Sequence, residues 1–178
     1  MAHVITAVFA IGLIIIGAVT LTNSALSSAG DIALSFPEMV GREGEKARTK
    51  LELITADSSS TSTNIDISVR NAGQTALAEF SRWELLIQYY ESSNNVDLKV
   101  LRLTHTTSTQ PASGQWTKRG IYMDAATQEA EVYEPNVFNP GEEMVLRLNV
   151  SPAIPENTDN LVTVATANGV TLSAPFSR

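Results

Sequence analysis

The sequence contains no cysteine, and that absence excludes several kinds of chemistry at once. Structural disulfides, thiolate metal sites and cysteine-dependent catalysis all require a residue that this chain lacks. If the chain is exported past a membrane, its stability must come from packing or from contacts with neighbouring molecules.

Charge is missing from the N-terminal part, where no Asp, Glu, Lys or Arg occurs before Asp31. Residues 2–21 are almost wholly apolar, and about 20 such residues in a helix span roughly 30 Å, the thickness of bilayer hydrocarbon. The basic and aromatic anchors of a permanent membrane span are absent, as is the positive n-region of a signal peptide. Three interpretations stay open: a cleaved signal peptide, a permanent anchor, or a helix in the core of a polymer.

Small residues such as Gly12, Gly17 and Ala18 interrupt the bulky ones in this stretch. Small residues allow helix backbones to approach closely, so we expect this helix to pack against copies of itself. The residues expected to form the polymerisation core are Val4, Val8, Phe9, Ile11, Gly12, Leu13, Ile14, Ile15, Ile16, Gly17, Val19 and Leu21.

Beyond residue 21 the helical pattern becomes amphipathic, with apolar residues at spacings of three and four from Leu26 to Phe36. Pro37 disfavours helical geometry at the residue before it, and two glycines follow it closely. We therefore predict a hydrophobic and amphipathic polymerisation helix over residues 1–36, followed by a charged connector over residues 37–50.

From residue 51 the hydrophobic period changes to two, which predicts a half-buried strand at 64–70 and further strands at 83–90, 96–103 and 144–150. The strand at 83–90 is apolar on both faces, so we expect it to be central or covered by a neighbour. The polar residues 92–95 predict a hairpin, Asn168-Gly169 predicts a tight two-residue hairpin, and 104–120 has the composition of a long surface loop. We therefore predict an α+β chain, in which a long N-terminal hydrophobic helix precedes an antiparallel immunoglobulin-like β-sandwich head over residues 51–178.

Catalytic motifs are also lacking, and the only histidines are His3 and His105. There is no nucleophile elbow, zinc-protease motif or phosphate-binding loop, so we expect no enzymatic activity, cofactor or metal. The net charge of −7 and the sequence pI of about 4.8 argue against nucleic-acid binding. The pair Glu142-Glu143 is expected to lie in a solvated turn.

Polar candidates for contacts between subunits are Lys118 and Arg119, at the end of the predicted loop. We expect them to reach an acidic neighbour such as the Glu142-Glu143 turn of another copy. Asn149 begins a glycosylation acceptor pattern with Ser151, although Pro152 directly after it weakens such sites.

An uncharged apolar helix, an amphipathic continuation and a β-sandwich with the stretches VRNAGQTAL, FNPGEEMVLRL and ANGVTLSAPF resemble the archaellins. Archaellins are the filament subunits of the archaeal-type flagellum and belong to the wider type IV pilin superfamily. A bacterial pilin has glutamate at the fifth mature position, where this chain has Ile5. The resemblance implies an extracellular motility filament built from copies of one chain, which is inserted in the membrane before assembly and joined at its base to a motor.

Two alternatives remain open. Membrane-anchored β-sandwich proteins that accompany the archaeal motor as stator-like components share the same outline. A cell-surface binding module would need an exposed aromatic or charged cluster, for which Trp83, Tyr89, Tyr90 and Trp116 are the candidates. Of these we expect Trp83 to be buried in the core of the head.

Overall fold

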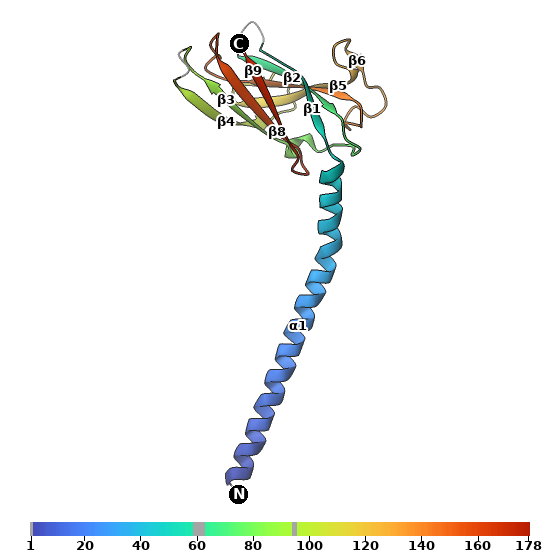
Figure 1. Ribbon diagram of the computed structural model, residues 1–178, viewed down its shortest axis with the longest axis vertical. Helices are drawn as coiled ribbons and strands as arrows, with labels where there is room; N and C mark the ends of the chain where they lie inside the picture. Colours follow the sequence, from blue (N-terminus) through green and yellow to red (C-terminus); the bar gives the residue numbers. More distant parts are fainter. Residues whose placement is uncertain (1, 59–62, 94–95) are drawn as a thin grey trace. The chain divides into compact units, whose positions relative to one another are not determined.

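The computed structural model describes the backbone of residues 2–58, 63–93 and 96–178. It describes their side chains as well, except at 2–10, 25, 28–35, 38 and 58. The chain divides into two units, Met1–Gly44 and Glu45–Arg178, and the larger unit is the head (Figure 1).

Helix α1 spans Ala2–Arg48 and contains Pro37 in its interior. The predicted end at Phe36 is therefore wrong, and residues 37–48 are helical rather than a connector. Proline removes one N–H from a helix but leaves its own carbonyl available to the next turn. The residues that follow, rich in Glu, Lys, Arg and Met, favour the helix, and Lys46 and Arg48 in the last turn are favourable next to its negative end.

The last turn of α1 belongs to the head, and Thr49 stops the helix there. The Thr49 N–H donates to the carbonyl of Lys46 at 3.1 Å, and its hydroxyl donates to the carbonyl of Glu45 at 2.8 Å. Asn168, in the turn between the last two strands, donates its amide to the Thr49 hydroxyl at 2.8 Å. Two of the last helical carbonyls, those of Glu45 and Lys46, are thus bonded to Thr49, which the head holds in place.

A turn at residues 71–75 also forms hydrogen bonds with the backbone at the end of this helix. Gln74 N donates to the Arg48 carbonyl at 2.7 Å, and Ala72 N donates to the Lys50 carbonyl at 2.9 Å. Gly73 lies so close that a Cβ added to it would be 2.5 Å from both Arg48 O and Lys50 N. Only glycine fits this approach without displacing the backbone.

The head consists of short strands and one 3₁₀ turn, η1. The elements are β1 Leu51–Ser58, β2 Asn64–Asn71, η1 Phe80–Arg82, β3 Glu84–Tyr90, β4 Leu98–His105, β5 Gln115–Asp124, β6 Glu129–Ala130, β7 Glu143–Asn149, β8 Asp159–Ala165 and β9 Thr171–Ser177. The strand order is β1-β2-β7-β5-β4-β3-β8-β9, with β6 on β5. All pairs are antiparallel except β4 with β5.

The two halves of this order form the layers of a β-sandwich (Figure 1). The layer β1-β2-β7-β5 has the order of the ABED sheet of an immunoglobulin domain, and β4-β3-β8-β9 has that of its CFG sheet with one added strand. The terminal strands β1 and β9 contact each other, which gives the sandwich a barrel-like closure. The α+β class and the mostly antiparallel β-sandwich are therefore confirmed.

The core of the head follows the period of two that the sequence predicts. Alternate residues of four strands are completely buried: Ile65, Ile67, Val69, Leu85, Ile87, Tyr89, Met144, Leu146, Leu148, Val162 and Val164. Trp83 is 3% exposed, as expected, and packs edge-on against Phe80 with 5.3 Å between the ring centroids.

Two predicted loops differ from the structure. β4 and β5 extend into the expected loop 104–120, which leaves residues 106–114 as the connection and places Trp116 at full burial in β5. The hairpin at Asn168-Gly169 exists, but Ala165 pairs with Thr171, so its turn has five residues rather than two. Thr166 lengthens this turn because its hydroxyl bonds both Asn168 and Val170.

Replacement of Gly73 by alanine tests the attachment of the helix end. We expect Gly73→Ala to lower the free energy of unfolding by about 1 to 3 kcal/mol, because backbone atoms must move to admit the new methyl group. Gly44→Ala is the matched control, since nothing lies within 4 Å of an added Cβ there and alanine favours a helix. Denaturation of the full chain, followed by tryptophan fluorescence, measures both; equal stability of the two variants would contradict the close approach.

Candidate functional site

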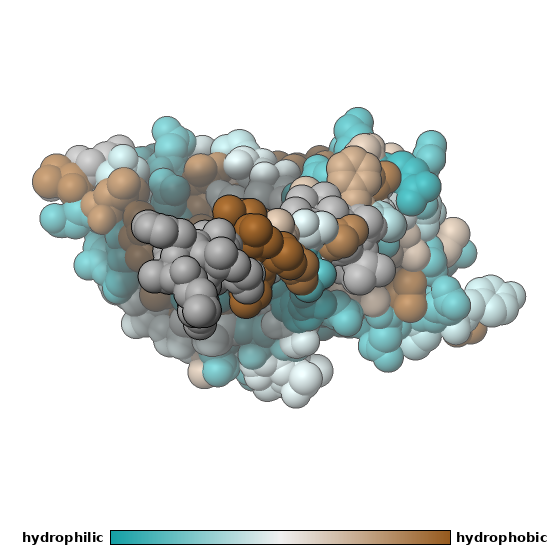
Figure 2. All heavy atoms as spheres, turned by 90° about the horizontal axis from the view of Figure 1, so that it is seen from below, coloured by the Kyte–Doolittle hydropathy of each residue, from teal (hydrophilic) through white to brown (hydrophobic). Residues whose placement is uncertain are grey.

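The apolar surface of α1 is the first candidate site. Seven large aliphatic side chains are each more than half exposed: Ile11, Leu13, Ile14, Ile15, Ile16, Val19 and Leu21. Residues 13–16 occupy one helical turn, so this surface surrounds the helix instead of forming a single stripe. Figure 2 shows the hydrophobic residues of α1 in brown. The side chains of Val4, Val8 and Phe9, which complete the predicted core, lie outside the described residues.

Polar groups within this apolar surface are satisfied by the helix itself. Thr20 donates its hydroxyl to the Ile16 carbonyl at 2.5 Å, and Thr22 donates to the Ala18 carbonyl at 2.8 Å. Threonine hydroxyls bonded in this way can be covered by another apolar surface without losing a partner. Gly12 and Gly17 have open space around the position of an added Cβ. Among the residues that the structure describes, no helix carries an apolar stretch sufficient to cross a membrane.

Lys118 and Arg119, the predicted contact residues of the head, belong to β5 rather than to a loop. Lys118 Nζ donates to the Pro135 carbonyl at 2.6 Å and to Asn136 Oδ1 at 3.1 Å. It also lies 4.9 Å from the centroid of the Phe80 ring, and burial lowers the pKa of this lysine. Its ammonium group is therefore engaged within its own head.

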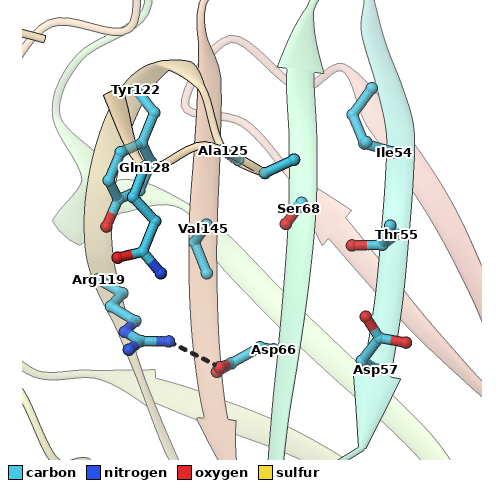
Figure 3. A pocket seen from close by; sticks show the side chains of 11 residues that line it. Ile54, Thr55, Asp57, Asp66, Ser68, Arg119, Tyr122, Ala125, Gln128 and Val145 are labelled. Atoms are coloured by element: carbon cyan, nitrogen blue, oxygen red, sulfur yellow. Dashed lines mark hydrogen bonds and ion pairs between the residues drawn. The ribbon is translucent and has the colours of Figure 1, made fainter. Parts of the chain in front are cut away.

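Arg119 lines a shallow groove of about 330 Å³ on the outer face of β1, β2, β7 and β5 (Figure 3). Asp66 accepts hydrogen bonds there from Arg119 Nη1 at 3.1 Å and from two nitrogens of Arg147 at 2.7 and 2.5 Å. The hydrogen bond to Asp66 raises the pKa of Arg147. Hydroxyl groups of Thr55 and Ser68 also line the groove, beside the apolar side chains of Ile54 and Val145, and none of the lining residues is a nucleophile paired with a base.

Glu142 and Glu143 are buried, so the expected solvated turn is wrong. Glu142 is 6% exposed, and its carboxylate accepts the Asn139 N–H at 2.6 Å. Glu143 is 5% exposed, accepting Arg70 Nη2 at 2.6 Å on one oxygen and Ala125 N at 2.9 Å on the other. Both carboxylates hold loops of their own head in place, which the alternation of a strand pattern cannot reveal.

Asn149, the predicted glycosylation acceptor, is the last residue of β7. It is partly buried and donates its amide nitrogen to Asn64 Oδ1 at 2.8 Å. That nitrogen is the atom to which a glycan would be attached, and here it joins two neighbouring strands.

The aromatic cluster expected of a binding module is not at the surface. Tyr89 and Trp116 are completely buried, Trp83 is nearly so, and Tyr90 is partly buried. His105 packs edge-on against Trp116, with 4.7 Å between the centroids. His3 lies outside the described side chains, and among the residues whose side chains are described no group of three or more His, Asp or Glu could hold a metal.

Comparison with known proteins adds to this geometry. No family model and no curated protein matches the chain. The archaellum periplasmic stator protein FlaG from Sulfolobus acidocaldarius is 18% identical with a TM-score of 0.50, over 72% of this chain and 99% of FlaG. The complex of FlaF and FlaG from the same organism gives 17% identity and a TM-score of 0.50, over 72% of this chain and 89% of that one.

The archaeal flagellum of Methanospirillum hungatei strain JF1 is 13% identical with a TM-score of 0.53, over 97% of this chain and 90% of its own. The chain has the fold of archaellum proteins. The resemblance to archaellins that the sequence indicates is thereby confirmed for the fold, and stator proteins of the archaellum share it.

Removal of the Asp66 charge tests the groove. We expect Asp66→Asn to lower the free energy of unfolding by about 1 to 3 kcal/mol, because the partly buried Arg147 loses its anion and the exposed Arg119 loses a partner. Glu84→Gln is the matched control, since Glu84 pairs with Arg102 on an exposed surface and such pairs contribute little. Urea denaturation compares the variants, and equal losses would show that the Asp66 cluster behaves as ordinary surface.

Acid stability should depend on His105. Burial, and then the charge of Lys118, lower the pKa of His105 from its ordinary value of 6.5. The unfolded chain binds this proton more tightly, so the contribution is complete above about pH 6.5 and is lost as the pH falls toward the folded pKa. The difference in unfolding free energy between the wild type and His105→Gln should shift against the wild type between about pH 7.5 and pH 5. A difference independent of pH would contradict the assignment.

Proposed function

We propose that this chain is a structural subunit of an extracellular, archaellum-like filament and has no catalytic role. In this proposal the chain polymerises through α1 into a helical homopolymer. The observation that carries it is the apolar surface between Ile11 and Leu21, which is exposed on every side of the helix. A single partner would cover only one stripe, whereas a bundle of equivalent helices covers the whole circumference.

The energetics support a polymer that needs no disulfide. Burial of a large aliphatic side chain contributes on the order of 1.5 to 3 kcal/mol, and seven such residues are exposed in the described part of α1. No charged residue precedes Asp31, so helices can approach one another there without burying an unpaired charge. The predicted core residues keep their assignment in this proposal.

The extent of the similarity to a solved filament supports a filament subunit over other archaellum components. The likeness to the Methanospirillum filament covers nearly the whole chain and so includes α1 as well as the head. The membrane before assembly and the machinery at the filament base are the further partners that this function requires.

A second candidate function is that of a stator-like accessory protein. The likeness to FlaG covers 99% of FlaG but 72% of this chain, and this observation favours the alternative. The two functions predict different locations: a filament subunit is found as a polymer of one chain in the sheared extracellular fraction, whereas an accessory protein stays with the cell. Electron microscopy and gel analysis of both fractions distinguish them.

An aspartate in the apolar surface tests the polymerisation. We expect Ile14→Asp to abolish filaments, because an unpaired carboxylate would be buried in the bundle. Thr107→Asp adds the same charge to an exposed loop of the head and should leave filaments intact. Normal filaments from Ile14→Asp in electron micrographs would refute the helix core.

A further inference from the structure

The groove on the outer face of β1, β2, β7 and β5 is formed by a row of short side chains. Thr55 pairs with Ser68, Ser68 with Val145, and Val145 with Gly120, so these four residues lie side by side across four strands. The neighbouring rows carry longer side chains: Asp57, Asp66 and Arg147 on one side, and Arg70, Glu143 and Tyr122 on the other. The short row is therefore the floor of the groove, whose volume of about 330 Å³ falls within the range of small-molecule sites.

A β-bulge borders the groove on each side. The register between β1 and β2 shifts at Ile54, and the register between β5 and β7 shifts at Arg119, so each of these is an extra residue in its strand. Both side chains line the groove, and Figure 3 shows them on opposite sides of it. A bulge changes the direction of a side chain, and these two bring an apolar group and a guanidinium to one cavity.

The turn at residues 125–128 forms a wall of the groove and is fixed from within the head. Asp124 Oδ1 accepts Ala126 N at 2.8 Å, and the buried Glu143 accepts Ala125 N at 2.9 Å. Gln128 has a φ of 57°, in the left-handed region, and its side-chain amide lines the groove (Figure 3). A wall held in this way loses little conformational entropy when a ligand binds.

Tyr122 provides an aromatic surface beside this wall. A Cβ added to Gly120 would be 2.5 Å from Tyr122 Oη and 2.7 Å from its Cζ, so the ring covers Gly120 and lies along β5 (Figure 3). Tyr122 lines the groove together with Val145 and Ile54. One part of the groove is therefore apolar, and it includes an aromatic ring with a polar hydroxyl at its end.

The uncharged polar side chains of the groove have hydrogen-bonding capacity that the head does not use. The side chains of Thr55, Ser68 and Gln128 form no hydrogen bond to another residue that the structure describes. Each of them can both donate and accept. A ligand with hydroxyl groups, which also donate and accept, matches this set.

The charges of the groove balance, which argues against a charged ligand. Asp57 pairs with Asp66 across β1 and β2, and like charges opposite each other are unfavourable. Asp66 is neutralised by Arg147 and Arg119, whereas Asp57 is exposed and has no bonding partner among the described residues. A phosphate or carboxylate in the groove would meet Asp57, and an ammonium group would meet Arg119. The groove therefore favours a neutral, hydroxyl-rich molecule with an apolar side.

We propose that this groove binds a neutral saccharide. The C–H side of a sugar ring packs against Tyr122 and Val145, while its hydroxyl groups bond to the polar side chains around it. Asp57 accepts from a sugar hydroxyl, and the Gln128 amide can donate or accept. A free sugar and the end of a surface glycan share this chemistry. The site goes beyond the proposed function and does not depend on it, because it belongs to the head alone.

Saturation-transfer NMR of the full chain, as filaments or in a detergent without a sugar head group, tests the site. The probes are the methyl glycosides of glucose, galactose, mannose and N-acetylglucosamine. We expect at least one to bind, and the variant Asp57→Ala with Gln128→Gly to bind it about tenfold more weakly, because two hydrogen bonds are lost. The variant should stay folded, since it removes a like-charge pair and glycine accepts the φ of residue 128; thermal unfolding checks this.

Asp97→Ala with Gln110→Gly is the matched control, because it removes the same side chains at exposed positions outside the groove. Weaker binding by the groove variant and unchanged binding by the control support the site. No binding of any of the four glycosides, or equal binding by both variants, overturns it.

Glucose 6-phosphate and glucosamine serve as charged probes, and tighter binding of either than of methyl glucoside overturns the assignment to a neutral ligand. Binding of the methyl glycosides alone assigns the groove to free sugars, whereas retention on beads that carry the same sugars assigns it to glycan ends. Filament formation is unaffected by any of these results, so the failure of this site leaves the proposed function standing.

Discussion

The end of a helix is a physical constraint, because its last carbonyls have no helical N–H to accept. In this chain the turn after β2 supplies one missing donor, Gln74 N to the Arg48 carbonyl, and Thr49 supplies two more to Lys46 and Glu45, held in place by Asn168 of the turn between β8 and β9. Asn71 organises the turn after β2: its amide donates to Thr75 O and Phe138 O at 2.9 Å, and its side-chain oxygen accepts Gly73 N. The helix therefore ends where the head can bond it, at Arg48, and the proline has no effect on that position.

This explains which parts of the fold the sequence could predict. Strands with one buried side, such as β2 and β3, show the period of two because each residue is either inside or outside. The sequence misplaces the helix end because the local signal at Pro37 concerns one hydrogen bond, whereas the helix is stopped by Thr49, whose hydroxyl is held by Asn168 more than a hundred residues away. The turn at Asn168 is longer than the Asn-Gly pair predicts because the Thr166 hydroxyl bonds both Asn168 and Val170 within it.

In the candidate site too, features that depend on single residues could be predicted, and features that depend on distant partners could not. An exposed apolar helix can be predicted from composition alone, because hydrophobicity and missing charge are properties of each residue. Burial of a charge depends on partners that are distant in sequence, and so Glu143 with Arg70, 73 residues away, was expected in solvent. The polar residues before Trp116 predict a loop there, yet β5 carries Trp116 into the core beside His105.

Charge is distributed along the chain in a way that bears on assembly. With no charged residue before Asp31, the whole net charge of −7 lies in the later part, so neighbouring heads repel one another while the N-terminal helices do not. That repulsion is screened beyond about 8 to 10 Å at physiological salt. In the proposed filament most of the cohesion would therefore come from the uncharged helices, because repulsion between the acidic heads opposes contacts that bring like charges within this distance.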